Sequence, residues 1–127
     1  MRRLTMAWVR KAEADIQLAR RASRSKQPLH DGVCFHCQQA AEKYLKALLQ
    51  DLGLPIPYIH DLDALLGRLL LQEPALKKLR RGLRFLAPFA VDYRYPGATA
   101  NLRQAQAALR WAERTRHEIR TRLGLPA

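Results

Sequence analysis

The stretch from Asp31 to Leu52 limits the possible folds more than any other part of the chain. Its sequence, DGVCFHCQQAAEKYLKALLQDL, repeats apolar residues at helical spacing over a face too wide for one neighbouring helix to cover. Asp31 can cap the start of this helix, and Gly53 can end it. Alanines on the apolar face allow neighbouring helices to approach closely, so we predict a central helix in a compact bundle.

The opposite side of this predicted helix carries a polar stripe. The stripe comprises His36, Gln39, Lys43, Lys46 and Gln50, flanked by Gln38 and Glu42. Phe35 is unusual among these polar residues, and we assign it to a contact between subunits.

Two cysteines, Cys34 and Cys37, form a C-x-x-C pattern on the central helix. A redox pair, or half of a metal site with His30 or His36, are the functional alternatives. The chain has no second cysteine pair, and no βαβ pattern surrounds this one. Both thiols fall on the apolar side, where cysteine packs as a small hydrophobic residue, so we interpret them as core residues and predict no metal site.

Helical periodicity also predicts the elements around the central helix. The expected helices cover residues 4–23, 62–72 with Asp61 as N-cap, 74–85 and 100–123. The segment LPIPYIH contains two prolines and should be extended, whereas residues 90–99 are aromatic and should be ordered. Since no strand pattern or long repeat is present, we predict an all-α fold, an antiparallel bundle of four to five helices forming one domain over residues 1–127.

The charge balance indicates the class of partner. The chain has 23 Lys and Arg against 11 Asp and Glu, a formal net charge of +12, which favours an anionic partner such as nucleic acid, nucleotide or an acidic protein. No apolar run reaches the roughly 18 residues of a membrane span. The N-terminal stretch is charged where a secretory signal is apolar, so we predict a cytoplasmic protein without membrane contact.

Few residues stand out as catalytic. The glycines are scattered, so no phosphate-binding glycine loop is present. Asp15 falls at the margin of the apolar face of the first helix, and we interpret it as a surface ion-pair partner of Lys11, with a role in a site as the alternative. Arg110 and His117 share one side of the last helix, where a guanidinium and an imidazole could cleave RNA. Arginine is so frequent that such pairs are expected by chance, so the spacing alone is not evidence.

Three motifs in order resemble the HEPN (higher eukaryotes and prokaryotes nucleotide-binding) family, small stand-alone prokaryotic type. They are FHCQQAAEKYLKALL, then HDL at residues 60–62, then DYRYP at residues 92–96, and the resemblance covers nearly the whole chain. It implies a helical bundle that forms homodimers or higher homo-oligomers. Many members are encoded beside a minimal nucleotidyltransferase as a toxin-antitoxin-like pair. Some are metal-independent ribonucleases with an arginine, a polar residue and a histidine near the start of the last long helix.

This chain departs from the ribonuclease motif. Arg94 has no histidine within the required reach, and Arg110 is followed by Trp111 instead of a small polar residue. The resemblance therefore implies a nucleotide-binding partner subunit of a separately encoded nucleotidyltransferase, with no cofactor apart from a bound nucleotide. Two alternatives stay open: a metal-independent ribonuclease toxin using Arg110 and His117, and a helical scaffold without a ligand.

The resemblance also indicates which residues would bind a ligand. They are Gln39, Lys43, Lys46, His60, Tyr93, Arg94 and Tyr95. In an anion pocket, the lysines and Arg94 would bind phosphate, and a tyrosine would stack on a base. The alternative is that His60 and Arg94 hold loops against the central helix through Glu42 and backbone carbonyls.

Overall fold

The computed structural model describes residues 2–127, except for the side chain of Arg94. The described chain is all-helical, as predicted. Its α-helices are α1 (Arg2–Ser23), α2 (His30–Asp51), α3 (Leu62–Leu69), α4 (Arg80–Leu86) and α5 (Leu102–Leu123), and its 3-10 helices are η1 (Pro74–Leu79), η2 (Ala87–Ala90) and η3 (Asp92–Arg94). None of the helices in this described part is long and apolar enough to cross a membrane.

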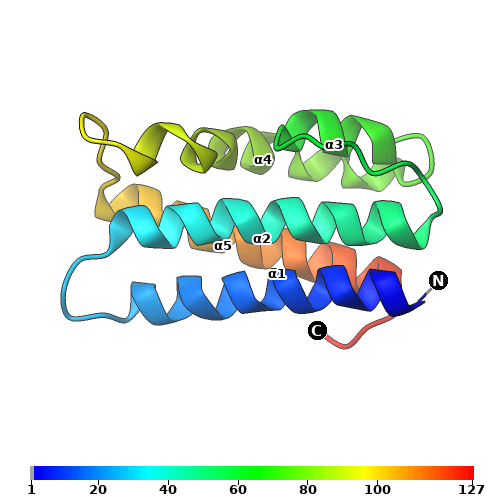
Figure 1. Ribbon diagram of the computed structural model, residues 1–127, viewed down its shortest axis with the longest axis horizontal. Coiled ribbons are helices and arrows are strands. Elements are labelled where there is room, and N and C mark those ends of the chain that lie inside the picture. The colour runs from blue at the N-terminus through cyan, green and yellow to red at the C-terminus, as the bar shows by residue number, and fades with distance from the viewer. Residues whose placement is uncertain (1) are drawn as a thin grey trace.

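The helix α2 occupies the centre of the bundle and contacts α1, α3, α4 and α5. It runs antiparallel to α1, and the shorter α3 and α4 lie along its other side, with α5 behind (Figure 1). This position confirms the prediction that the wide apolar face of residues 31–52 serves several neighbours.

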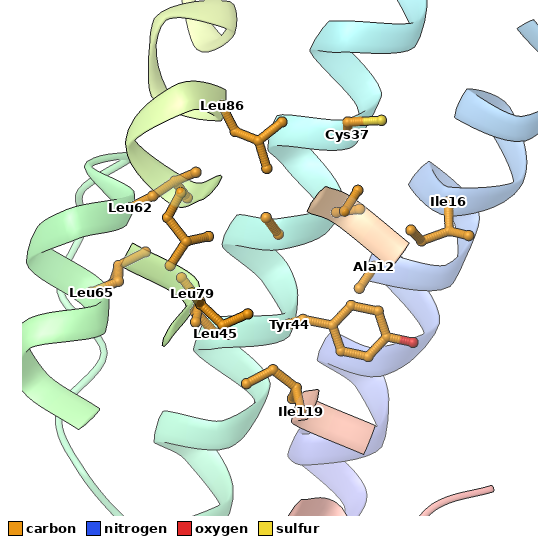
Figure 2. Close-up of a cluster of buried hydrophobic side chains, with 14 of the residues drawn as sticks. Ala12, Ile16, Cys37, Tyr44, Leu45, Leu62, Leu65, Leu79, Leu86 and Ile119 are labelled. Carbon is orange, nitrogen blue, oxygen red and sulfur yellow. The ribbon is translucent and has the colours of Figure 1, made fainter. Parts of the chain in front are cut away.

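The core is built around the apolar face of α2. Figure 2 shows side chains from α1, α2, α3, α4 and α5 converging there, with Tyr44 and Leu45 at the centre. Cys34 and Cys37 are buried free thiols, which confirms their interpretation as core residues. Burial raises the pKa of Cys34 to about 12, and it raises the pKa of Cys37 as well.

The helix ends agree with the sequence in part. The Asp61 side chain caps α3, and Gly53, which follows the Leu52 C-cap of α2, has a positive φ of 69°. The predicted cap by Asp31 is wrong, because α2 begins one residue earlier and Asp31 instead accepts a hydrogen bond from the backbone N–H of Ala100 at 2.7 Å. That contact comes from a residue distant in sequence, which local cap rules cannot anticipate.

The region after α3 differs in detail from the prediction. The helix expected over residues 62–72 ends at Leu69, and the one expected over residues 74–85 is divided into η1 and α4. The first part is a 3-10 helix with Pro74 at its start, the tighter form that short helical segments often adopt. Gly82 on α4 lies against the Trp111 ring of α5, so closely that a Cβ at this position would clash with the ring.

Candidate functional site

A cleft of about 470 Å³ lies between α1, α2 and residues 54–60, here called the return segment. It is lined by Trp8, Gln39, Glu42, Lys43, Lys46, Gln50, Ile56, Pro57, Tyr58 and His60. The cleft brings together Gln39, Lys43, Lys46 and His60, which are the predicted ligand-binding residues outside the segment 90–99. The polar stripe of α2 forms its floor.

The return segment is held along α2 by His60. Two prolines keep the segment extended, so it returns beside the helix it follows. The Nδ1 of His60 lies 2.9 Å from Oε2 of Glu42, and the Gln38 side-chain amide donates to the His60 carbonyl at 3.4 Å. These contacts agree with the interpretation that His60 holds a loop against the central helix.

Glu42 is a buried carboxylate with three polar or cationic partners, since the Gln38 side-chain amide also donates to it at 3.3 Å. Its side chain is 4% exposed and accepts a hydrogen bond from the Lys46 ammonium at 3.0 Å, in addition to the bond from His60. Lys46 is nearly as buried and lies 5.6 Å from the centre of the Trp8 ring. The charge of Lys46 is thus balanced by Glu42 and placed over an aromatic face.

Asp15 is the centre of a second cluster, in which a carboxylate again contacts one lysine and one histidine. The Lys43 ammonium donates to Asp15 Oδ2 at 2.5 Å, and the Nδ1 of His36 lies 2.8 Å from Asp15 Oδ1. The predicted surface pair with Lys11 is wrong, because Asp15 is only 6% exposed and points toward α2. Packing of α1 on α2 supplies partners that the spacing within α1 could not reveal.

Both clusters contain hydrogen-bonding groups that have no partner within the cluster and are available to a ligand in the cleft. A lysine ammonium has three N–H donors, and Lys43 and Lys46 each give one to a carboxylate. A carboxylate only accepts hydrogen bonds, so the bond to Glu42 places a proton on Nδ1 of His60 and leaves Nε2 free. The His60 side chain is 69% exposed, so this second nitrogen is accessible to a ligand.

The remaining predicted residues lie elsewhere. Tyr93 packs against Phe89, with ring centroids 4.6 Å apart, and accepts a weak hydrogen bond from Gln104 at the start of α5. Tyr95 is exposed, and neither tyrosine lines the cleft. The side chain of Arg94 lies outside the described residues. The aromatic residues near the cleft are instead Trp8 and Tyr58.

Sequence reasoning missed these two aromatic residues for different reasons. Trp8 falls at helical spacing on the apolar face of the first helix, and only the packing of α1 on α2 shows that it also borders the cleft. Tyr58 lies between two predicted elements in LPIPYIH, where an exposed aromatic residue could have indicated a binding role. Arg110 and His117 are both exposed on α5, and neither contributes to the cleft.

Comparisons with known proteins agree with this architecture. A family model described as HEPN domain matches residues 5–121. TT1696 from Thermus thermophilus is similar in structure with a TM-score of 0.78 and 24% sequence identity, covering 92% of this chain and 96% of that chain. ST0689, described as an archaeal HEPN homologue, has a TM-score of 0.76 and 27% identity, covering 93% and 96%.

No curated protein sequence matched the chain. The first of the two structures supports the fold alone, whereas the family model spans most of the sequence and includes α2 and most of α1 and α5. On the strength of that match, the chain belongs to the HEPN family.

Proposed function

We propose that this chain is a nucleotide-binding HEPN protein that uses the cleft as its ligand site and acts as the partner subunit of a separately encoded minimal nucleotidyltransferase. The observation that carries the ligand proposal is the cleft itself, where two lysine donors and the open Nε2 of His60 lie beside two aromatic rings. The transferase and the toxin-antitoxin-like pairing rest on the family resemblance. A cytoplasmic location remains a prediction from the sequence.

The phosphate groups of the nucleotide would bind on the α2 side of the cleft. Lys43 is the more exposed of the two lysine donors, and Lys46 lies about one turn further along α2. The carboxylates of Asp15 and Glu42 balance the two lysines, so neither lysine charge is buried without a partner. Phosphate binding then uses the N–H donors that the carboxylates leave free.

The base would bind at the aromatic edge. Trp8 is half-buried and already carries Lys46 over its ring, whereas Tyr58 is fully exposed at the rim. Stacking of a base on an aromatic side chain contributes about 1–3 kcal/mol, and every base offers a suitable face. The return segment therefore supplies a stacking residue without rearrangement of the helices.

Isothermal titration with ATP, ADP and AMP tests the ligand proposal. We expect micromolar binding that Tyr58→Ala weakens roughly tenfold or more, because the stack is lost. His60→Gln should also weaken binding. Leu71→Ala is the matched control, since Leu71 is a fully exposed apolar residue outside the cleft. Absence of binding, or binding that neither cleft variant changes, would refute the site.

The assembly is a separate part of the proposal. HEPN family members often dimerise. A hollow of about 210 Å³ between the end of α1, the start of α2 and α5 exposes Leu29 and Leu102, and we assign it to the homodimer. Light scattering of wild type and Leu102→Glu should show a dimer and a monomer, respectively. Phe35 is half-buried against His36, and its predicted role in a subunit contact stays a prediction.

The transferase contact needs its own experiment. Co-purification with a minimal nucleotidyltransferase from the same genome should give a stable complex on size-exclusion chromatography. Separate elution at micromolar concentrations would remove the partner-subunit part of the proposal and leave nucleotide binding to stand alone.

A metal-free RNA cleavage assay separates this proposal from the ribonuclease alternative. Arg110 and His117 share the exposed side of α5, which is the geometry that alternative needs. Cleavage that is lost in both Arg110→Ala and His117→Ala, with the fold intact, would establish a nuclease. If neither nucleotide nor RNA is bound or cleaved, the scaffold alternative holds.

A further inference from the structure

The solvent-facing side of α5 carries a second concentration of positive charge. Its exposed residues Arg103, Arg110, Arg114 and His117, here called the outer row, fall on the side opposite the buried Ala108, Ala112 and Ile119. The acidic residues that flank the row are engaged elsewhere, Glu113 with Arg20 and Glu118 with Lys78 and Arg122. None of the three arginines forms an ion pair within the described chain.

Contact between α4 and α5 gives this row a fixed shape. Gly82 brings the α4 backbone directly against Trp111, where no side chain would fit. The Arg114 guanidinium lies over the ring of the same Trp111, 5.3 Å from the ring centre. This contact favours one position of the Arg114 side chain, which lowers the entropic cost of binding a ligand there.

Arg110, Trp111 and Arg114 line a hollow of about 340 Å³. The two arginines are one turn apart, roughly 6 Å along the helix axis, and Arg103 lies roughly 10 Å before Arg110. A guanidinium binds two oxygens of one phosphate at once. A row of such groups suits a ligand with phosphates repeated along a chain, since several contacts form together.

We propose that the outer row of α5 binds the phosphodiester backbone of a nucleic-acid strand without reading its sequence. Backbone contacts position a strand but carry no base information. This surface is separate from the cleft, because the residues that line the hollow and those that line the cleft do not overlap. It gives the excess of arginine on the last helix a specific role.

Fluorescence anisotropy with a labelled 12-mer of deoxythymidine tests this surface, because the probe lacks the 2'-hydroxyl that a metal-independent ribonuclease would use. We expect the double variant Arg110→Gln and Arg114→Gln to lose at least tenfold in affinity at 50 mM salt. The slope of log affinity against log salt concentration should fall in magnitude by about 1.4, because each of the two lost phosphate contacts to a single strand contributes about 0.7. Trp111→Leu should give an intermediate loss, since it removes the support of Arg114.

The matched control is Arg3→Gln with Arg10→Gln, which removes the same charge from exposed positions of α1. It should keep affinity within about threefold of wild type. An equal loss in both double variants would mean that net charge alone drives binding and would overturn the proposal. The absence of probe binding by the wild type would also overturn it. Displacement of the probe by poly-glutamate as efficiently as by unlabelled oligonucleotide would overturn it too, because that result would indicate an acidic protein partner.

Discussion

In the cleft, Lys43 and Lys46 each meet a buried carboxylate, whereas Arg110 and Arg114 on the outer row of α5 meet none among the described residues. The difference follows from burial. A charge that is largely removed from water needs a partner of opposite sign, but an exposed one is stabilised by solvent. The cleft lysines therefore contribute to the fold as well as to a ligand site, and the outer row is free to serve binding alone.

Removal of a cleft carboxylate should have the largest effect on the stability of the protein. Glu42→Ala leaves Lys46 buried without its anion and releases His60, so we expect the free energy of unfolding to fall by about 3–5 kcal/mol. Urea unfolding followed by circular dichroism measures this change. Arg110→Ala is the comparison on the outer row and should stay within about 0.5 kcal/mol of wild type. Similar losses in both variants would break the contrast between the two regions.

The next effect concerns the support of the outer row. Gly82→Ala places a methyl group 2.0 Å from the Trp111 ring, so we expect a loss of about 1–3 kcal/mol from forced repacking. Gly67→Ala is the same change in α3, where nothing lies within 4 Å of the new methyl group. That variant should gain about 0.5–1 kcal/mol, because alanine is the better helix residue. Thermal unfolding of both proteins checks the opposite signs.

A third prediction extends the paired-charge side of the comparison to pH. Burial by itself raises the pKa of Glu13. Hydrogen bonds from Arg116 and Tyr44 and the charges of Arg116 and Arg120 together lower it by more, so the pKa of Glu13 lies below its ordinary value of 4.5. Stability from this group is complete above the unfolded pKa and is lost as pH falls through the lower folded pKa.

Glu13→Gln should therefore cost about 1–2 kcal/mol at pH 7 and less on acidification below pH 4.5. Free energies of unfolding for wild type and variant between pH 7 and pH 3 test this. A difference between the two proteins that stays constant over the range would show that the ionised carboxylate contributes no linked stability.

The smallest expected effect is on the chemical reactivity of the two buried thiols of α2. Cys34 and Cys37 are fully buried, and the raised pKa of each leaves little thiolate at neutral pH. We expect almost no alkylation by iodoacetamide at pH 8 in the folded protein and complete alkylation in guanidinium, read by mass spectrometry. Rapid labelling of the folded protein would indicate that α2 opens locally.

Several features were predictable because they depend on residues close in sequence. The central helix, the Asp61 cap and the burial of both cysteines follow from helical spacing and local hydrogen bonding. The capping box of Asn101 and Gln104 at the start of α5 was also visible in the sequence, as an Asn followed three residues later by Gln, but it was missed.

The grouping of the candidate residues was only partly predictable. The α2 stripe placed Gln39, Lys43 and Lys46 together because they share a helix face. The pairing of Asp15 with Lys43 depends on how α1 rotates against α2, and the sequence interpretation chose Lys11 instead. The motif resemblance groups Tyr93 with the site, but its ring packs on Phe89 of η2 and its hydroxyl accepts a hydrogen bond from Gln104 of α5.

The sequence by itself determined the helical fold, the buried face of α2 and the excess of positive charge, since these depend on periodicity and composition. Only the tertiary structure decided which charges are neutralised and which remain open to a ligand. Ion pairing between helices depends on their rotation and separation, which are set by the packing of the whole core. Asp15, for example, is buried against α2, whereas Arg110 is exposed to solvent.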